Sequence, residues 1–205
     1  VVGSLTAGVE VSGAETVNTC VAKSDGTVWC WGYGADGQLG GGTSQTSTAP
    51  LQVAGVGDAV TVATSTSNGC ALLSAGTVSC WGNTYMGILA LDDVGSAEHP
   101  PERIGTARMI DGVTGAQSLS VGQGGACVVR ADGKVVCWGC DENGLSGNGG
   151  GNSCDGWNYN PSGLFGPSVV PGVDGAVSVS IGQRHACAAL SDGTVKCWGL
   201  DNGTG

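Results

Sequence analysis

Four copies of one short pattern dominate the chain. Each copy has two cysteines ten positions apart, a glycine six positions after the first cysteine, and a Trp-Gly pair beginning directly after the second. The first copy reads CVAKSDGTVWCWG from Cys20, and the others begin at Cys70, Cys127 and Cys187. Such self-similarity identifies a repeat protein in which each repeat is one supersecondary unit.

Each copy predicts a β-hairpin, because alternating Val, Ala, Thr and Leu residues flank a short turn whose third residue is glycine. In Ser24-Asp25-Gly26, a type I turn is followed by a glycine that can take the left-handed conformation without steric cost. Counting outward from this turn places Cys20 directly opposite Cys30, at a Cβ separation close to what a disulfide needs. The spacing therefore predicts a cross-strand bridge in every hairpin.

The segments around the hairpins supply further strands. GDAVTVATSTSNGC from Gly57 and GAVSVSIGQRHAC from Gly175 each precede a hairpin, and a stretch such as PLQVAGV follows its glycine-rich loop. About four short strands per repeat is the content of one propeller blade, and glycine at 40 of 205 positions argues against long helices. We expect an all-β propeller of four-stranded antiparallel blades, about four in number, forming one repeat domain over residues 1–205. The expected blades are 1–56, 57–114, 115–174 and 175–205, the last incomplete.

The ten cysteines divide into four pairs within the repeats plus Cys140 and Cys154, which bracket an insertion in the third repeat. The expected bridges are Cys20–Cys30, Cys70–Cys80, Cys127–Cys137, Cys187–Cys197 and Cys140–Cys154. No C-x2-C or Cys-His box is present, so structural disulfides are favoured over a metal site. An even count with local pairing favours an oxidising compartment outside the cytosol.

The charge balance bears on partners. Seventeen acidic residues against seven basic ones give a net charge of −10, which repels phosphate backbones and disfavours nucleic acid as a partner. No apolar run is long enough to span a membrane, and no secretory leader stands at the first residue. We therefore expect a mature or trimmed soluble segment.

Two stretches resemble a known family. GQRHACAALSDGTVKCWG (Gly182–Gly199) and WGYGADGQLGGG (Trp31–Gly42) are similar, nearly residue for residue, to the regulator of chromosome condensation repeat. The resemblance implies a β-propeller of four-stranded blades, commonly seven, and in disulfide-bearing members it also implies secretion. Four hairpins are too few for seven blades, so we expect part of a larger array or a partial propeller closed by a second copy.

The chain also departs from the family pattern. Asn18, Asn68 and Gly125 stand where the family usually has the histidine that His185 keeps. The Gly-Gln-Leu-Gly loop becomes MGILA in the second repeat and NGLSG in the third. The blade connections therefore tolerate change.

No catalytic residue is expected. His185 occupies a scaffold position of the repeat, and His99 lies in a proline-rich loop that we expect to be exposed. The aspartates of the hairpin turns, Asp25, Asp132 and Asp192, suit local bonding to the backbone. The chain is thus predicted not to be an enzyme and to need no cofactor.

Two other kinds of site have candidate residues. No metal is expected overall, although Asp141, Asn143 and Asp155 in the third-repeat insertion offer the oxygen ligands that calcium prefers. Asn202 begins an Asn-Gly-Thr tripeptide, which is a glycosylation acceptor pattern in a eukaryotic secretory route.

The remaining class of function is binding. We expect a secreted or cell-surface, non-enzymatic scaffold for protein–protein interaction or extracellular assembly, with a protein or further copies of itself as partner. The contact surface is predicted within residues 141–165, where Trp157, Tyr159 and Phe165 are candidate anchors. The alternative is an inhibitor of an extracellular enzyme, since a secreted β-lactamase inhibitor resembles the same propeller family. Guanine nucleotide exchange, the founding activity of that family, is disfavoured by the disulfides and the acidity.

Overall fold

The computed structural model describes residues 6–14, 17–84, 87–90, 103–148 and 164–200. Every regular element in these ranges is a β-strand, and all strand pairs are antiparallel. Within this part of the chain, no helix has the length and hydrophobicity that a membrane span requires. The predicted all-β class is confirmed.

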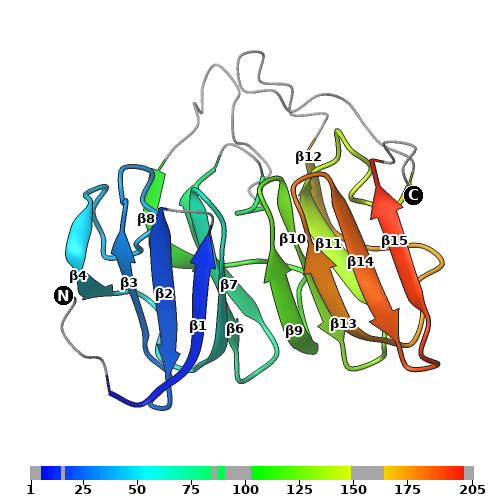
Figure 1. Cartoon of the computed structure of the whole chain (residues 1–205), viewed down its shortest axis with the longest axis horizontal. Coiled ribbons are helices and arrows are strands. Elements are labelled where there is room, and N and C mark those ends of the chain that lie inside the picture. Colours follow the sequence, from blue (N-terminus) through cyan, green and yellow to red (C-terminus); the bar gives the residue numbers. More distant parts are fainter. Residues whose placement is uncertain (1–5, 15–16, 85–86, 91–102, 149–163, 201–205) are drawn as a thin grey trace. The chain divides into compact units, whose positions relative to one another are not determined.

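The strands form four sheets, which we call blades 1 to 4 (Figure 1). Blade 1 contains β1 (Gly8–Ala14), β2 (Asn18–Lys23), β3 (Val28–Gly32) and β4 (Ser47–Gln52). Blade 2 contains β5 (Ala59–Thr64), β6 (Asn68–Leu73), β7 (Val78–Asn83) and β8 (Arg103–Met109). Blade 3 contains β9 (Ala116–Val121), β10 (Gly125–Arg130), β11 (Val135–Cys140) and β12 (Leu164–Val169). Blade 4 contains β13 (Ala176–Ile181), β14 (His185–Leu190) and β15 (Val195–Gly199).

In every blade the strands lie side by side in chain order, and each blade falls within one of the four predicted repeat segments. The chain divides into two compact units. The first unit is Val1–Asn83 with Arg103–Ile110 and holds blades 1 and 2, and the second is Thr84–Glu102 with Asp111–Gly205 and holds blades 3 and 4. Each unit has its own apolar core, built mainly from Val, Ala, Leu and the bridged cysteines.

The hairpin register is the one predicted from the turn. Gly26 has φ of +81°, and its N–H donates to the Lys23 carbonyl. Cys20 lies opposite Cys30, and equivalent pairs form in the other blades. All four pairs are bonded as disulfides, with Cα atoms 4.0–4.1 Å apart. This short separation is that of an antiparallel pair that exchanges no backbone hydrogen bonds, which brings the two side chains closest together.

The glycine of each Trp-Gly pair is required by its backbone. Gly32, Gly82, Gly139 and Gly199 have φ between +110° and +128°. A Cβ added at any of them would lie 2.2–2.6 Å from the carbonyl oxygen of the residue just before the neighbouring strand. Both the conformation and the close approach therefore exclude a side chain there.

We predict that Gly82→Ala lowers the free energy of unfolding by at least about 2 kcal/mol, because it combines a disfavoured φ with a backbone clash. Gly57→Ala is the matched control, since a Cβ at Gly57 meets nothing within 4 Å and its φ is ordinary. Urea unfolding with the disulfides intact measures both. Equal effects of the two substitutions would contradict this explanation of the Trp-Gly glycine.

In blades 2, 3 and 4, the repeated tryptophan joins the blade to the loop that follows the hairpin of the preceding repeat. The indole N–H of Trp81 donates to the Gln38 carbonyl oxygen at 2.8 Å within the first unit. In the second unit, Trp138 donates to Ile88 at 2.8 Å and Trp198 to Leu145 at 2.9 Å. Each acceptor lies seven residues after the preceding repeat's tryptophan. Because the acceptor is a backbone oxygen, the side chain at that position can change without loss of the bond.

One residue of these loops is strained. Gly40 and Gly147 take φ of +69° and +78°, and the equivalent position of the second repeat holds Ala90 at φ +46°. The left-handed conformation costs a residue with a Cβ about 1–2 kcal/mol. Ala90 therefore destabilises the loop that accepts the Trp138 hydrogen bond.

We predict that Ala90→Gly raises the free energy of unfolding by about 1 kcal/mol, since it removes this strain. Ala54→Gly is the control, because Ala54 lies in a turn without a positive φ and its replacement should destabilise by about 0.4–1 kcal/mol through the unfolded chain. Chemical denaturation measures the change in the free energy of unfolding for each variant and so distinguishes stabilisation from destabilisation. A loss of stability in both variants would show that Ala90 is not strained.

The four hairpin bridges differ in exposure. Both cysteines of the bridges in blades 1, 2 and 3 are 0% exposed, whereas Cys187 is half-buried and Cys197 is exposed. A thiolate must reach a sulfur atom to reduce a disulfide. Access therefore distinguishes the bridge of blade 4 from the other three.

We predict that limiting dithiothreitol reduces Cys187–Cys197 before the other three bridges in dilute native protein. Alkylation followed by peptide mass spectrometry identifies the modified cysteines. The same treatment in denaturant is the control, because all bridges become accessible when the chain unfolds. Simultaneous reduction of all four bridges in the native protein would refute the order based on exposure.

Candidate functional site

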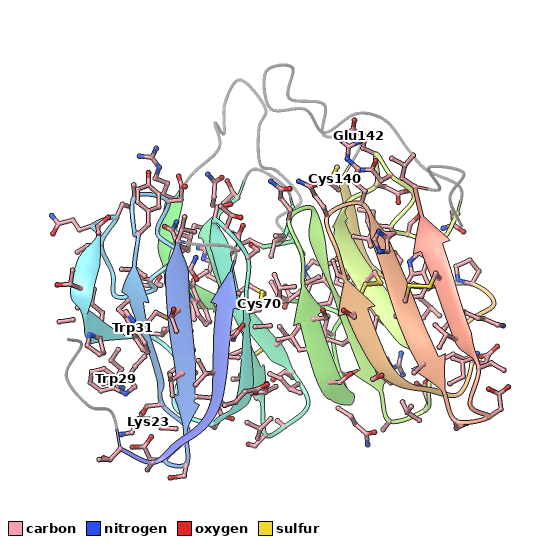
Figure 2. The ribbon with its side chains drawn as sticks, in the orientation of Figure 1. Lys23, Trp29, Trp31, Cys70, Cys140 and Glu142 are labelled. Atoms are coloured by element: carbon pink, nitrogen blue, oxygen red, sulfur yellow. A yellow bond between two sulfur atoms is a disulfide. The ribbon has the colours of Figure 1, made fainter. Side chains whose placement is uncertain are left out.

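Several residues predicted from the sequence lie outside the described residues. They are His99, Cys154, Asp155, Trp157, Tyr159 and Asn202. Phe165 is described: it lies on β12 opposite Gly139 and packs, half-buried, against the core of the second unit. Cys140, at the end of β11, is buried and disulfide-bonded (Figure 2). The Cys140–Cys154 pairing and two of the three predicted anchors stay predictions.

The turn aspartates bond locally. The Asp25 carboxylate accepts from the Thr27 backbone N–H at 3.0 Å and from the Thr27 hydroxyl at 2.6 Å. The pKa of Asp25 lies well below its ordinary value because of the Thr27 hydroxyl first and the Lys23 ammonium second. Asp192 repeats this arrangement with Thr194, whose hydroxyl bond likewise lowers the Asp192 pKa. These carboxylates therefore serve as turn acceptors.

The candidate calcium ligands are only partly described. Both carboxylate oxygens of Asp141 accept from Ser146, one from its N–H at 2.7 Å and the other from its hydroxyl at 2.8 Å. Asn143 lies two residues on and is half-buried. Among the described residues, no three His, Cys, Asp or Glu side chains gather in a way that could hold a metal ion. In this part of the chain, Asp141 organises its own loop.

The second unit contains a pocket of ≈ 270 Å³ between the ends of blades 3 and 4. Three loops form it: the β9–β10 turn, the segment that follows β11, and the β13–β14 turn. The polar side chains lining it include Gln123, Glu142, Arg184 and His185. Glu142 projects just beyond the end of β11 (Figure 2). The pocket thus borders the described part of the predicted contact region, residues 141–148.

The corresponding space in the first unit is filled by two amide side chains. Asn18 donates to the Ser65 carbonyl oxygen at 2.9 Å, and Gln38 donates to that of Thr66 at 3.1 Å. Both amides are buried. They span the gap between the blade 1 loops and the β5–β6 turn.

In the second unit, the repeat positions of these two amides hold Gly125 and Leu145. Glycine has no side chain to cross the gap, and the Leu145 side chain lies so close that a Cβ added at Gly125 would be 2.4 Å from its Cδ2. The pocket therefore lies where the third repeat differs from the first at both positions.

The lining of the pocket combines charged, hydrogen-bonding and apolar groups. The Glu142 carboxylate, the Arg184 guanidinium and the His185 imidazole supply charge and hydrogen-bonding groups, and Leu145 and Ile181 supply apolar wall. Across the rim, the Gln183 amide donates to the Gln123 amide oxygen at 2.6 Å. No hydroxyl is among its described lining, and its only sulfur, that of Cys140, is bonded in a disulfide.

Both positions are departures from the family pattern in the sequence: Gly125 replaces the family histidine, and Leu145 lies in NGLSG, the altered Gly-Gln-Leu-Gly loop. Neither departure by itself indicates a pocket. Gln123 and Arg184 carried no signal of their own. Comparing the two positions together between the first and third repeats would have indicated the site.

Solved structures provide the fold comparison. Human WBSCR16 aligns with a TM-score of 0.73 at 22% identity, over 94% of this chain and 47% of that one. Yeast RCC1 (Prp20), solved bound to Kap60, aligns with a TM-score of 0.74 at 19% identity, over 97% of this chain and 45% of that one. The computationally designed Ika4 protein aligns at a TM-score of 0.51 and 14% identity, over 97% of this chain and 94% of that one. At these identities the likeness shows the propeller fold alone, and the chain spans about half the length of the two natural proteins.

Comparison with curated protein sequences returns no match. Family models do match: one for the regulator of chromosome condensation (RCC1) repeat covers residues 25–72, and a second with the same description covers 116–145 and 176–205. Together they account for more than half of the chain, and they include all four bridged hairpins in part or in full. With four bridged hairpins of one register and four propeller-type sheets, the chain belongs to the regulator of chromosome condensation repeat family.

Proposed function

We propose that the chain is a non-enzymatic interaction module that acts outside the cytosol and binds a protein partner through the pocket of blades 3 and 4. The observation that carries this proposal is the paired change at positions 125 and 145, which leaves a polar, charged pocket where the first unit is filled. A loss of packing without functional consequence would not explain why charged side chains line several sides of the pocket. Protein partners suit the fold, since yeast RCC1 (Prp20) was solved bound to Kap60.

The bridged hairpins support the location and the mechanism. Disulfides persist in oxidising compartments, and each short bridged loop contributes on the order of 2–3 kcal/mol in a model-dependent way. They hold the strands rigid beneath the pocket loops. A preorganised frame lowers the ordering entropy that a binding loop loses on association.

A partner for this pocket carries groups of both signs or neutral hydrogen-bonding groups. Glu142 and Arg184 line the same space, so a ligand of a single charge would meet repulsion from one of them. An extended peptide segment fits, because its backbone supplies both donors and acceptors. Further copies of the chain are a second class of partner.

The pocket is tested by introducing the two amide side chains that fill the corresponding space in the first unit. The double variant Gly125→Asn with Leu145→Gln restores both amides, and Glu142→Ala with Arg184→Ala removes charge without touching buried residues. A library of displayed random peptides is selected on the wild type, and the enriched peptides are titrated against each variant. We predict that affinity falls about tenfold or more, equivalent to about 1.4 kcal/mol, in both double variants.

Arg103→Ala in the first unit is the control for removal of an exposed charge, and affinity should be unchanged. Thermal melting checks that the filled variant remains folded. Peptides that bind both double variants as well as the wild type, or a selection that enriches no peptide, would rule out the pocket as the binding site.

A further inference from the structure

The turn that joins β5 and β6 in the first unit is held by two carboxamide side chains of blade 1. The Asn18 amide nitrogen donates to the Ser65 carbonyl oxygen at 2.9 Å and to that of Thr66 at 3.4 Å. The Gln38 amide nitrogen donates to the same Thr66 oxygen at 3.1 Å. Two successive backbone carbonyls of this turn therefore receive three N–H bonds from neutral side-chain amides.

The β13–β14 turn of the second unit closes with the same backbone bond. In the first turn the Ser65 N–H donates to the Asn68 carbonyl oxygen at 2.8 Å, and in the second the Gly182 N–H donates to that of His185 at 2.9 Å. Gly182 and Gln183 occupy the repeat positions of the two residues whose carbonyls the amides bind. Both line the pocket. The pocket therefore contains the equivalent pair of backbone acceptors.

Each turn is also attached to the preceding blade by the same kind of bond. The Thr64 N–H donates to the Ser12 hydroxyl at 3.1 Å, and the Ile181 N–H donates to the Ser120 hydroxyl at 3.0 Å. Each serine lies opposite the first cysteine of its own blade's hairpin. The two turns thus meet their preceding blades at the same place, so the carbonyl pair of the second turn faces the part of blade 3 that corresponds to the amides of blade 1.

The described part of blade 3 supplies no donor to these carbonyls. Gly125 and Leu145 stand at the two amide positions, and neither side chain has an N–H or O–H group. Among the described residues, none donates a hydrogen bond to the carbonyl oxygen of Gly182 or Gln183. The wall of the pocket therefore keeps two adjacent backbone acceptors available to a bound group.

A primary carboxamide is the group that matches this wall. It carries two N–H donors on one nitrogen, and Asn18 shows that one such nitrogen reaches two successive carbonyl oxygens of this turn. It is neutral, so neither the Glu142 carboxylate nor the Arg184 guanidinium of the lining repels it. The Gln183 amide donates to the Gln123 amide oxygen, and no described residue accepts from the Gln123 nitrogen. That nitrogen is a donor for the oxygen of a bound carboxamide.

We infer that the pocket recognises an asparagine or glutamine side chain of the partner, whose N–H groups donate to the carbonyl oxygens of Gly182 and Gln183. The partner supplies the donors that Asn18 and Gln38 supply within the first unit. This inference rests on the proposed binding function and adds the chemical group that the pocket selects. Both amides of the first unit are buried, which shows that a turn of this kind accepts carboxamides in a desolvated contact.

Side chains of similar size bind less well for different reasons. Glutamate has the shape of glutamine but no N–H donor, and its charge faces two carbonyl oxygens. Methionine has the length of glutamine but leaves both carbonyls unpaired, at the cost of a lost hydrogen bond. The lysine ammonium donates to carbonyls, but Glu142 and Arg184 act on its charge in opposite directions, so it recovers little of the hydration that it loses.

The partner side of the contact is tested with the peptides that selection from the displayed library enriches on the wild type. They should share an asparagine or a glutamine at one position. Each peptide is synthesised with that residue and with methionine, lysine or the matching acid in its place, and calorimetry measures the dissociation constants. Each replacement should weaken binding about tenfold or more, equivalent to about 1.4 kcal/mol, which is the scale of one hydrogen bond.

The protein side is tested with Leu145→Gln, which places a competing carboxamide where Gln38 stands in the first unit. Its N–H should occupy the Gln183 carbonyl oxygen, as Gln38 occupies that of Thr66. The preference for a glutamine peptide over its methionine form should therefore fall from about tenfold to about twofold or less. Leu145→Met is the matched variant of similar length without a donor, and it should keep the preference whatever its affinity. Thermal melting checks that both variants remain folded.

Methionine forms that bind the wild type as tightly as the parent peptides would overturn this inference and leave the pocket itself as the binding site. An unchanged preference in Leu145→Gln, or an equal loss of preference in Leu145→Met, would also overturn it, because the donor would then have no part in the selection. Enrichment of lysine or of acidic residues at the shared position would assign the pocket to a charged group instead. A selection that enriches no peptide, or peptides that bind the filled double variant normally, would refute the proposed function and this inference together.

Discussion

The indole-to-carbonyl hydrogen bond between successive repeats is the interaction on which the rest of the structure depends. A blade of four short strands cannot bury both of its faces alone, so it must pack against a neighbour. The tryptophan fills the rear face, and its N–H fixes the loop of the preceding blade at about 2.8 Å, in Trp81 to Gln38 for example. A buried indole N–H without a partner costs about 1–3 kcal/mol, so the bond sets the position of that loop as well as stabilising it.

The local structure could be predicted from the sequence because it is determined within a few residues. The turn at Ser24–Gly26 fixes the register, the register places Cys20 opposite Cys30, and the closing glycine follows from a strand that approaches too closely for a Cβ. The acceptor of the tryptophan could not be predicted, because it lies on another repeat and is a backbone atom. The position of a backbone oxygen does not depend on which side chain the residue carries. For this reason Ile88 in MGILA and Leu145 in NGLSG accept the indole hydrogen bond as Gln38 does in the first loop.

The pocket was not predicted for a related reason. Asn18 and Gln38 are far apart in sequence, and nothing in either residue shows that both reach the β5–β6 turn. The third repeat changes both positions, to Gly125 and Leu145, and only the fold shows that the two changes affect one space. With Gly125 and Leu145 at these positions, the charged residues of the rim face an open space.

The hairpin bridges make such variation tolerable. Only 10 of 205 residues are aromatic, and the interblade cores consist largely of Val, Ala and cystine, so each interface buries small side chains. Burial stabilises by about 0.8 kcal/mol per methylene. A core of Val, Ala and cystine therefore gains less stability per residue than a core of Leu and Phe would. A covalent link within each hairpin adds stability that does not depend on what the loops contain, because it acts mainly on the unfolded chain. Loop positions such as 125 and 145 can then change for recognition, while the strands beneath them keep their register.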